Sequence, residues 1–187
     1  QLGAALIGAI GFGISSWFLT FAQARTDGVT VAIIAATTPV VAIAIEFILD
    51  GRRLTGRLVA GLALALTGGI AAYAAGLGSL KLGLGALAMF GSVVLYCWGS
   101  RAAVVDLAHV SPIGRAALPF VAAGLTMTAI SLAGGGLAAA VSTAAQNPGF
   151  VAATLLYGMG SIGLSQILWL QGVERLGIGI ASMHFNA

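Results

Sequence analysis

The sequence is poor in charge. Charged residues make up only 7% of the 187 residues, and the mean hydropathy is +1.07. A soluble domain carries roughly a quarter charged residues, so this chain has too few to cover a surface that faces water. Cys97 is its one cysteine and it has two histidines, which excludes a disulfide framework and a Cys/His metal cluster. A formal net charge of +3 is too small to indicate a nucleic-acid surface.

Long apolar stretches follow one another along the chain instead. Each is close to the ~20 residues that a helix needs to cross a bilayer. They lack the alternation of apolar and polar residues that is typical of a membrane β-barrel. We therefore expect an all-α, polytopic membrane protein. Its expected spans are 3–24, 29–49, 56–75, 83–105, 114–133 and 150–171, with a seventh beginning near Gly177.

The stretch 11–39 repeats weakly 149 residues later, at 160–187. The identities that fall in register include Gly11 with Gly160, Ser16 with Ser165, Gly28 with Gly177, and Ala32 with Ala181. Each copy consists of an apolar span, a short charged turn with glycine, and a second apolar span. Duplicated sets of helices in a membrane chain are typical of transporters that are built from two halves.

The basic residues in the connections indicate how the spans are oriented. The first and third connections hold Arg25 and Lys81, and the fifth, at 140–149, is uncharged. The second, fourth and sixth connections hold six basic residues, and the positive-inside rule makes this group cytoplasmic. The span 3–24 then runs outward and its equivalent, 150–171, runs inward, so the two copies are inverted. The six residues are Arg52, Arg53, Arg57, Arg101, Arg115 and Arg175.

The same register predicts a complete architecture. Equivalents of the spans 83–105 and 114–133 fall before residue 1, and the equivalent of 56–75 falls beyond residue 187. We therefore expect an inverted repeat of five plus five helices, in a whole chain of roughly 290 residues. Residues 1–80 belong to the first repeat, and residues 81–187 belong to the second.

The segment that ends the second span carries a family resemblance. Residues 37–39 read Thr-Thr-Pro, residues 50–55 read Asp-Gly-Arg-Arg-Leu-Thr, and a glycine-rich span follows. This resembles the drug/metabolite transporter superfamily, and in particular its EamA family, which places a proline in the fourth span and a Gly-Glu-x-Leu-Thr turn after it. Gly51, Leu54 and Thr55 match that turn, and Arg52 stands where Glu is usual. The resemblance implies a multi-pass protein of the cytoplasmic (inner) membrane that exports small metabolites, amino acids or amphipathic drugs by alternating access about a midplane cavity.

Polar and aromatic side chains in the spans are candidates for lining that cavity, because they are costly where they face lipid. In the span 150–171, Tyr157, Ser161, Ser165 and Trp169 recur every four residues on one face, with Gln166 beside it. The alternatives are close helix packing through Ser and Thr, and contact of Trp with lipid or with the membrane interface. The expected substrate-binding residues are Trp17, Tyr96, Trp98, Gln166, Trp169, His184 and Asn186, supported by Ser16, Thr37, Thr38, Pro39, Tyr157 and Ser165.

Two of the titratable residues inside the expected spans, His184 and Glu46, are candidates for binding an ion or a proton. The imidazole of His184 can bind or relay a proton there, and a structural hydrogen bond is the alternative. We expect Glu46 to reach the cytoplasmic rim or to pair with Arg52 or Arg53 rather than to couple an ion. Pro39 leaves a backbone carbonyl unpaired about one turn earlier, where nearby polar side chains can satisfy it or bind substrate.

The sequence thus predicts a secondary transporter that exports amino acids or related small amphipathic metabolites. Its expected partners are the substrate and the lipid bilayer, with no metal, cofactor or nucleic acid. A stripe of small residues at Ala5, Ala9 and Gly13, and another at Gly68, Ala72 and Gly76, are explained by internal packing, with a homodimer as the alternative.

Two other classes compete with transport. One is a membrane scaffold subunit, which would show no substrate-dependent flux. The other is a membrane-embedded enzyme, and the sequence has no Gly-x-Ser-x-Gly motif, no pair of Asp residues within the spans and no His-Glu-x-x-His motif to support it.

Overall fold

The computed structural model describes residues 2–184, except 53, 54, 57, 58, 62, 65, 66 and 69–82. Several expected features therefore lie outside the described residues: Arg53, Arg57, Lys81, Ala72, Gly76 and Asn186, together with most of the span 56–75. All regular structure in the described ranges is helical, as the all-α expectation requires.

Five described helices are long and apolar enough to cross a membrane, which fits a multi-pass membrane protein. They match five of the expected spans, and the differences are confined to the helix ends. The first consists of α1 (Leu2–Leu6), η1 (Ile7–Ile14) and α2 (Ser15–Arg25), and the second of α3 (Gly28–Ala36) and α4 (Thr38–Asp50). The others are α6 (Leu84–Val105), α7 (Pro112–Ala133), and the run of α9 (Pro148–Leu155), η2 (Leu156–Gly163) and α10 (Leu164–Leu176). Two shorter helices, α8 (Gly136–Gln146) and α11 (Ile178–Met183), complete the described fold.

The span Gly28–Asp50 is broken at Thr37, between α3 and α4. Pro39 has no N–H and cannot bond to the carbonyl of Ala35, four residues earlier. The Thr38 hydroxyl donates to that carbonyl instead, and the Thr37 hydroxyl donates to the carbonyl of Ile34 at 2.6 Å. The carbonyl that the sequence predicts to be freed is therefore satisfied within the helix itself.

The expected uncharged connection at 140–149 is wrong in its bounds. The helix α8 occupies most of it, because an alanine-rich stretch favours helix where packing does not decide. The chain turns earlier, at Gly135, whose φ of 73° lies in the left-handed region that glycine adopts without strain. Pro148 then begins α9 in the first-turn position where its missing N–H costs nothing.

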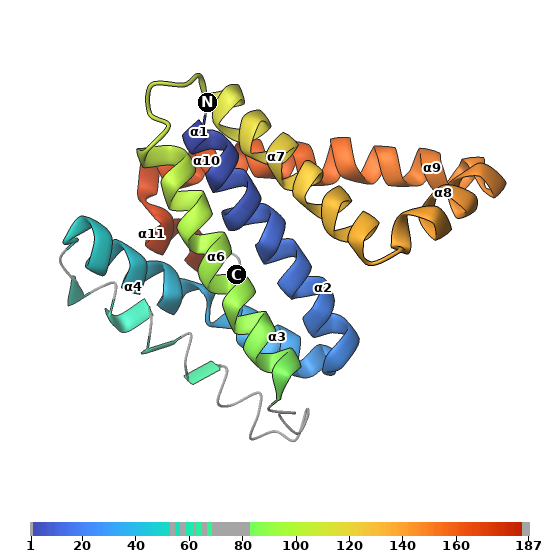
Figure 1. Ribbon diagram of the computed structural model, residues 1–187. Helices are drawn as coiled ribbons and strands as arrows, with labels where there is room; N and C mark the ends of the chain where they lie inside the picture. The colour runs from blue at the N-terminus through green and yellow to red at the C-terminus, as the bar shows by residue number, and fades with distance from the viewer. Residues whose placement is uncertain are drawn as a thin grey trace.

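The helix α6 lies in the middle of the bundle, and the span formed by α1, η1 and α2 runs alongside it (Figure 1). A Cβ added to Gly11 would lie 2.6 Å from the Cα of Gly99, so the two backbones are in direct contact. Four residues after Gly11, the Ser15 hydroxyl donates to the carbonyl of Ser92 at 3.0 Å, and the Ser92 hydroxyl donates to that of Ser15 at 2.8 Å. Since the partner numbers fall as these rise, the two helices are antiparallel.

The helix α7 packs on the opposite side of η1. A Cβ added to Gly8 would lie 2.1 Å from the carbonyl oxygen of Pro119, and one added to Gly13 would lie 2.9 Å from the Cβ of Thr126. Gly13 belongs to a predicted small-residue stripe and packs within the molecule, whereas Ala5 of the same stripe is exposed.

An arm projects from this bundle. Figure 1 shows α8 and α9 reaching away from α6 and α2, joined to the bundle through the end of α7 and through η2. None of the residues of α8, α9 or η2 is buried. Leu156 and Met159, for example, are 74% and 76% exposed. The arm therefore presents apolar surface that the described residues leave uncovered.

The predicted contact of Glu46 with an arginine is confirmed. Arg52 Nη1 donates to Glu46 Oε1 at 2.8 Å, and Arg52 Nη2 donates to the carbonyl of Leu176 at 3.2 Å. The side chain of Glu46 is only 7% exposed, and it lies against the start of α11, where a Cβ on Gly179 would be 2.8 Å from Glu46 Oε2. Through its bond to Leu176, Arg52 joins the second connection, which follows α4, to the sixth connection, which follows α10.

Two further ion-pair groups lie at the same end of the bundle. Arg101 pairs with Asp50 and, at 3.3 Å, with Asp106. Arg115 Nη1 donates to Glu174 Oε1 at 2.9 Å, while its Nε donates to the carbonyl of Val110. These contacts hold the second, fourth and sixth connections together, which are the three that the charge bias groups on one side.

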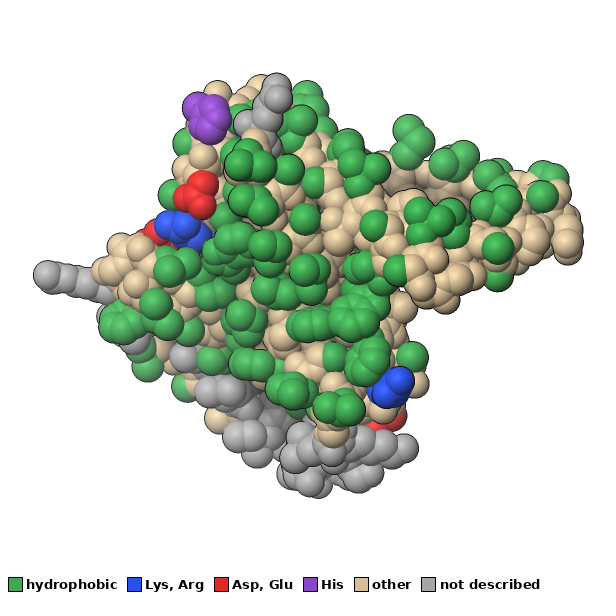
Figure 2. Space-filling model, in the orientation of Figure 1, with side chains coloured by type: hydrophobic (Ala, Val, Ile, Leu, Met, Phe, Trp, Pro, Cys, Tyr) green, Lys and Arg blue, Asp and Glu red, His purple; other side chains and the backbone are tan. Residues whose placement is uncertain are grey.

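The first connection lies at the other end of α6. Its Arg25 contacts the backbone at Gly85, and its Asp27 caps α3 by accepting from the Thr30 N–H at 2.8 Å. Figure 2 shows the charged side chains gathered in separate places, with a broad hydrophobic surface between them. This distribution suits a helical bundle whose two ends are polar and whose middle faces lipid.

The two π-helical segments are spaced as the sequence repeat is. Both bounds of η2 fall 149 residues after the bounds of η1, and α10 begins 149 residues after α2. π-Helical segments are rare in proteins, and those that occur often lie at functional sites. Their recurrence at this spacing gives the weak sequence repeat a counterpart in the local backbone.

Candidate functional site

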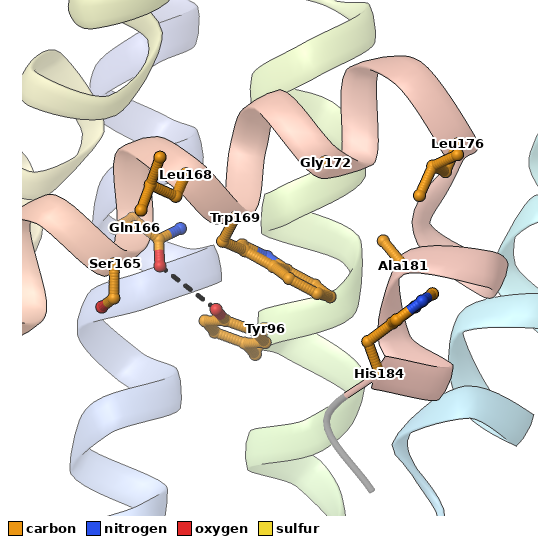
Figure 3. Close-up of a pocket in the computed structure, with 9 residues that line it drawn as sticks. All are labelled: Tyr96, Ser165, Gln166, Leu168, Trp169, Gly172, Leu176, Ala181 and His184. Atoms are coloured by element: carbon orange, nitrogen blue, oxygen red, sulfur yellow. Dashed lines mark hydrogen bonds between the residues drawn. The ribbon is translucent and has the colours of Figure 1, made fainter. Parts of the chain in front are cut away.

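Two cavities meet where α6 contacts α10. The smaller cavity, of about 440 Å³, is lined by Tyr96, Ser165, Gln166, Leu168, Trp169, Gly172, Leu176, Ala181 and His184 (Figure 3). The larger, of about 780 Å³, is lined by Tyr96 and Gln166 together with residues of η1, α2, α3, α4, α7 and η2. Both volumes lie in the range of small-molecule sites.

Tyr96 and Gln166 form the wall that the two cavities share. The Tyr96 hydroxyl donates to Gln166 Oε1 at 3.1 Å, which is the dashed contact in Figure 3. Gln166 is 6% exposed, and its Nε2 has no hydrogen-bond partner. A buried donor without a partner costs about 1–3 kcal/mol of free energy, so a ligand acceptor that bonds to this amide would recover part of that cost.

Aromatic rings extend from this wall into both cavities. The Tyr96 ring stacks on Trp169 with centroids 6.3 Å apart, and Trp169 Nε1 donates to the hydroxyl of Ser100 at 3.1 Å. On the side of the larger cavity, the ring of Phe12 meets the ring of Tyr96 edge to face, with centroids 5.8 Å apart. The Phe12 ring also packs at a tilt against the ring of Phe120, with centroids 5.2 Å apart. Rings in these arrangements form a rigid apolar wall that can hold a flat molecule.

Most hydroxyls around the cavities already have partners. Ser15 and Ser92 bond to each other across α2 and α6, Thr38 bonds to Ala35, and Ser165 donates to the carbonyl of Ile162 at 3.0 Å. The described residues that line the two cavities include no Asp, Glu, Lys or Arg. The arrangement therefore suits binding of a largely apolar molecule.

The structure brings most of the predicted site residues together. Tyr96 and Gln166 line both cavities, Ser165, Trp169 and His184 line the smaller one, and Ser16, Thr38 and Tyr157 line the larger one. His184 Nδ1 lies 3.2 Å from the carbonyl of Ile180, so the structural hydrogen bond considered for it is present.

Other predicted residues lie apart from the two cavities. Trp17 is 37% exposed and packs against the rings of Phe18 and Phe21. Trp98 is partly buried against the hydrophobic core and lines neither cavity. Thr37 and Pro39 form the break between α3 and α4, and Asn186 lies outside the described residues.

Several lining residues were not predicted from the sequence. Phe120, Ala123, Gly124 and Met127 line the larger cavity from one face of α7. Their spacing of three or four residues marks a helical face, but every face of α7 is apolar over this stretch, so the pattern carries no signal for a cavity.

The described residues include no group of three or more His, Cys, Asp or Glu side chains that are placed to hold a metal ion. No protein-family model, no curated protein and no solved structure matches the chain.

Proposed function

We propose that this protein is a secondary membrane transporter that exports small amphipathic metabolites, such as amino acids or their relatives, by alternating access. One observation carries the proposal: two adjoining cavities of small-molecule size lie between the helices and share the Tyr96–Gln166 wall. Residues from both proposed halves surround the larger cavity, with Ser15 and Thr38 in the first half and Phe120 in the second. Sites between two structural halves are typical of transporters that work by alternating access.

The backbone supports an inverted repeat for this transporter. The π-helical segments η1 and η2 recur at the spacing of the sequence repeat, and the charged connections alternate between the ends of α6. The helices α6 and α7 cover η1, whereas η2 is exposed. In the proposed ten-helix repeat, the equivalents of α6 and α7 cover η2 in the same way.

The EamA-like motif around Thr38 and Pro39 fits this proposal, and the cytoplasmic membrane is the proposed location. The family's usual Glu is replaced by Arg52, and Glu46 lies opposite it in the ion pair. The chain therefore keeps an acid that pairs with this position, placed earlier on α4.

Counterflow tests the transport function. The purified protein is reconstituted in liposomes that are loaded with an unlabelled solute, and entry of the labelled solute is followed for a panel of amino acids, amino-acid amides and amphipathic drugs. We expect transient accumulation above that of protein-free liposomes for at least one class of solute. Flux equal to that of protein-free liposomes across the panel would support the scaffold alternative instead.

A proton-binding role for His184 makes a separate prediction. Replacing His184 by Gln keeps a polar group near the Ile180 carbonyl but removes the titratable ring. Flux that depends on pH between 5 and 8 in the wild type is expected to lose that dependence in His184→Gln. An unchanged pH profile would leave His184 as part of the cavity wall only.

A further inference from the structure

We propose that the cavities bind an uncharged, largely aromatic or apolar molecule with a carbonyl-type acceptor, and that the Gln166 amide selects for that acceptor. This inference rests on the proposed transport function and narrows its substrate class, because it favours neutral molecules over zwitterionic amino acids. Four features of the site carry it: the charge of the lining, the pairing of its hydroxyls, the state of the Gln166 amide and the nature of the walls.

The described lining includes no Asp, Glu, Lys or Arg that could neutralise a charged ligand. A carboxylate or an ammonium group that leaves water needs an opposite charge or several hydrogen bonds. The acid Glu46 on α4 is bound to Arg52. A zwitterion would therefore lose its hydration at both ends without compensation.

The hydrogen-bonding capacity that remains is centred on Gln166. The hydroxyls of Ser15 and Ser92 bond to each other's helix, and that of Thr38 bonds to its own. Gln166 Nε2 is buried and has no partner. Among the buried lining groups that the structure describes, this amide nitrogen is the one left to meet a ligand.

Tyr96 determines what kind of ligand group the amide can meet. Its hydroxyl donates to Gln166 Oε1, so the oxygen is engaged and the NH₂ group remains. An NH₂ group only donates, so its partner is an acceptor such as a carbonyl, ether or ring nitrogen. Nε2 is covered in this conformation, so the proposal requires a small movement that opens Nε2 to a cavity while Oε1 stays on the Tyr96 hydroxyl.

The aromatic walls of the cavities favour a ring in the rest of the ligand. Trp169 stacks on Tyr96 from the smaller cavity, and Phe12 meets Tyr96 from the larger one, so flat apolar surfaces flank the amide on both sides. A ring beside these faces gains contact area, while its acceptor reaches the amide.

Three probes of the same indole scaffold test this proposal: N-acetyltryptophanamide, which is neutral and has two carbonyls, tryptophan, which is a zwitterion, and tryptamine, which is a cation. Binding to the reconstituted protein is measured by calorimetry. We expect N-acetyltryptophanamide to bind about tenfold or more tightly than either charged probe, since tenfold corresponds to one net hydrogen bond. We expect Gln166→Leu to lower its affinity about tenfold, and the exposed control Gln23→Leu to leave the affinity unchanged.

A second variant keeps the test decisive if Gln166→Leu does not fold. Tyr96→Phe keeps the ring but frees Oε1, so the amide can also offer its acceptor. We expect this variant to bind N-acetyltryptophanamide with reduced preference over tryptamine. Tryptophan or tryptamine binding as tightly as the neutral probe, no binding of the neutral probe, or an unchanged affinity in folded Gln166→Leu would each overturn the proposal.

The inference and the transport function fail in different ways. Counterflow of charged amino acids with no binding of the neutral probe would retain a transporter and overturn the ligand class. Gln166-dependent binding of the neutral probe without counterflow of any solute would retain the ligand class and overturn transport.

Discussion

Replacing Gly8 by alanine is expected to destabilise the protein by about 3 kcal/mol or more, or to prevent folding. A Cβ at this position would lie 2.1 Å from the carbonyl oxygen of Pro119 and 2.7 Å from the Cβ of Ala122. The first of these atoms is backbone, so no side-chain rotation relieves the overlap and η1 and α7 have to separate. Unfolding of the purified protein in detergent, followed by circular dichroism, measures the loss.

Gly3 provides the matched control. It precedes Gly8 in the same continuous span, and no atom lies within 4 Å of a Cβ added there. Alanine is a better helix former than glycine by about 1 kcal/mol, so Gly3→Ala is expected to leave stability unchanged or to raise it. Equal stability of Gly8→Ala and Gly3→Ala would contradict the close contact of η1 with α7.

Removing Arg52 is expected to cost about 3 kcal/mol of stability. Arg52→Ala leaves the carboxylate of Glu46 in the contact between α4 and α11, where Oε1 loses its partner and Oε2 already has none. It also removes the bond to the Leu176 carbonyl, which ties the second connection to the end of α10. The exposed Arg175 is the matched control, and Arg175→Ala is expected to change stability by less than about 0.5 kcal/mol.

A double-mutant cycle separates the buried charge from the other effects. In a Glu46→Gln background there is no carboxylate to leave unpaired, so Arg52→Ala is expected to cost much less than in the wild type. An equal loss of stability in both backgrounds, measured by the same unfolding experiment, would show that the pair is not coupled and would contradict its role at the α4–α11 contact.

Hydropathy predicts the helical spans well because a membrane helix has to bury its backbone groups within one apolar segment. The ends of the helices differ from the expected bounds of the spans. The helix α8 was not predicted, because an uncharged alanine-rich stretch is compatible with a helix and with a connection. Arg52 was one of two arginines predicted as a partner of Glu46, with the cytoplasmic rim as the alternative, because a buried acid close in sequence to a base has few other ways to be neutralised.

The site shows where sequence reasoning stops. The stripe in the span 150–171 is visible because polar residues recur on one face, and Ser165, Gln166 and Trp169 do meet at the smaller cavity. Periodicity defines a face but not the neighbour that the face meets. Trp17 is therefore indistinguishable in sequence from a cavity residue although it packs against Phe18, and Phe120 gives no sequence signal although it lines the larger cavity.

The central claim is that solute passes through these cavities. Counterflow through a variant whose smaller cavity is filled by a bulky side chain tests it most directly. Ser165 lines the smaller cavity, whereas Leu164, its neighbour, is 57% exposed and lines neither of the two cavities. Tryptophan at 165 adds a large ring where the substrate is proposed to pass, and tryptophan at 164 adds the same ring outside it. We predict that Ser165→Trp abolishes counterflow of the transported solute while Leu164→Trp retains it. Equal flux through both variants would contradict a transport path through these cavities.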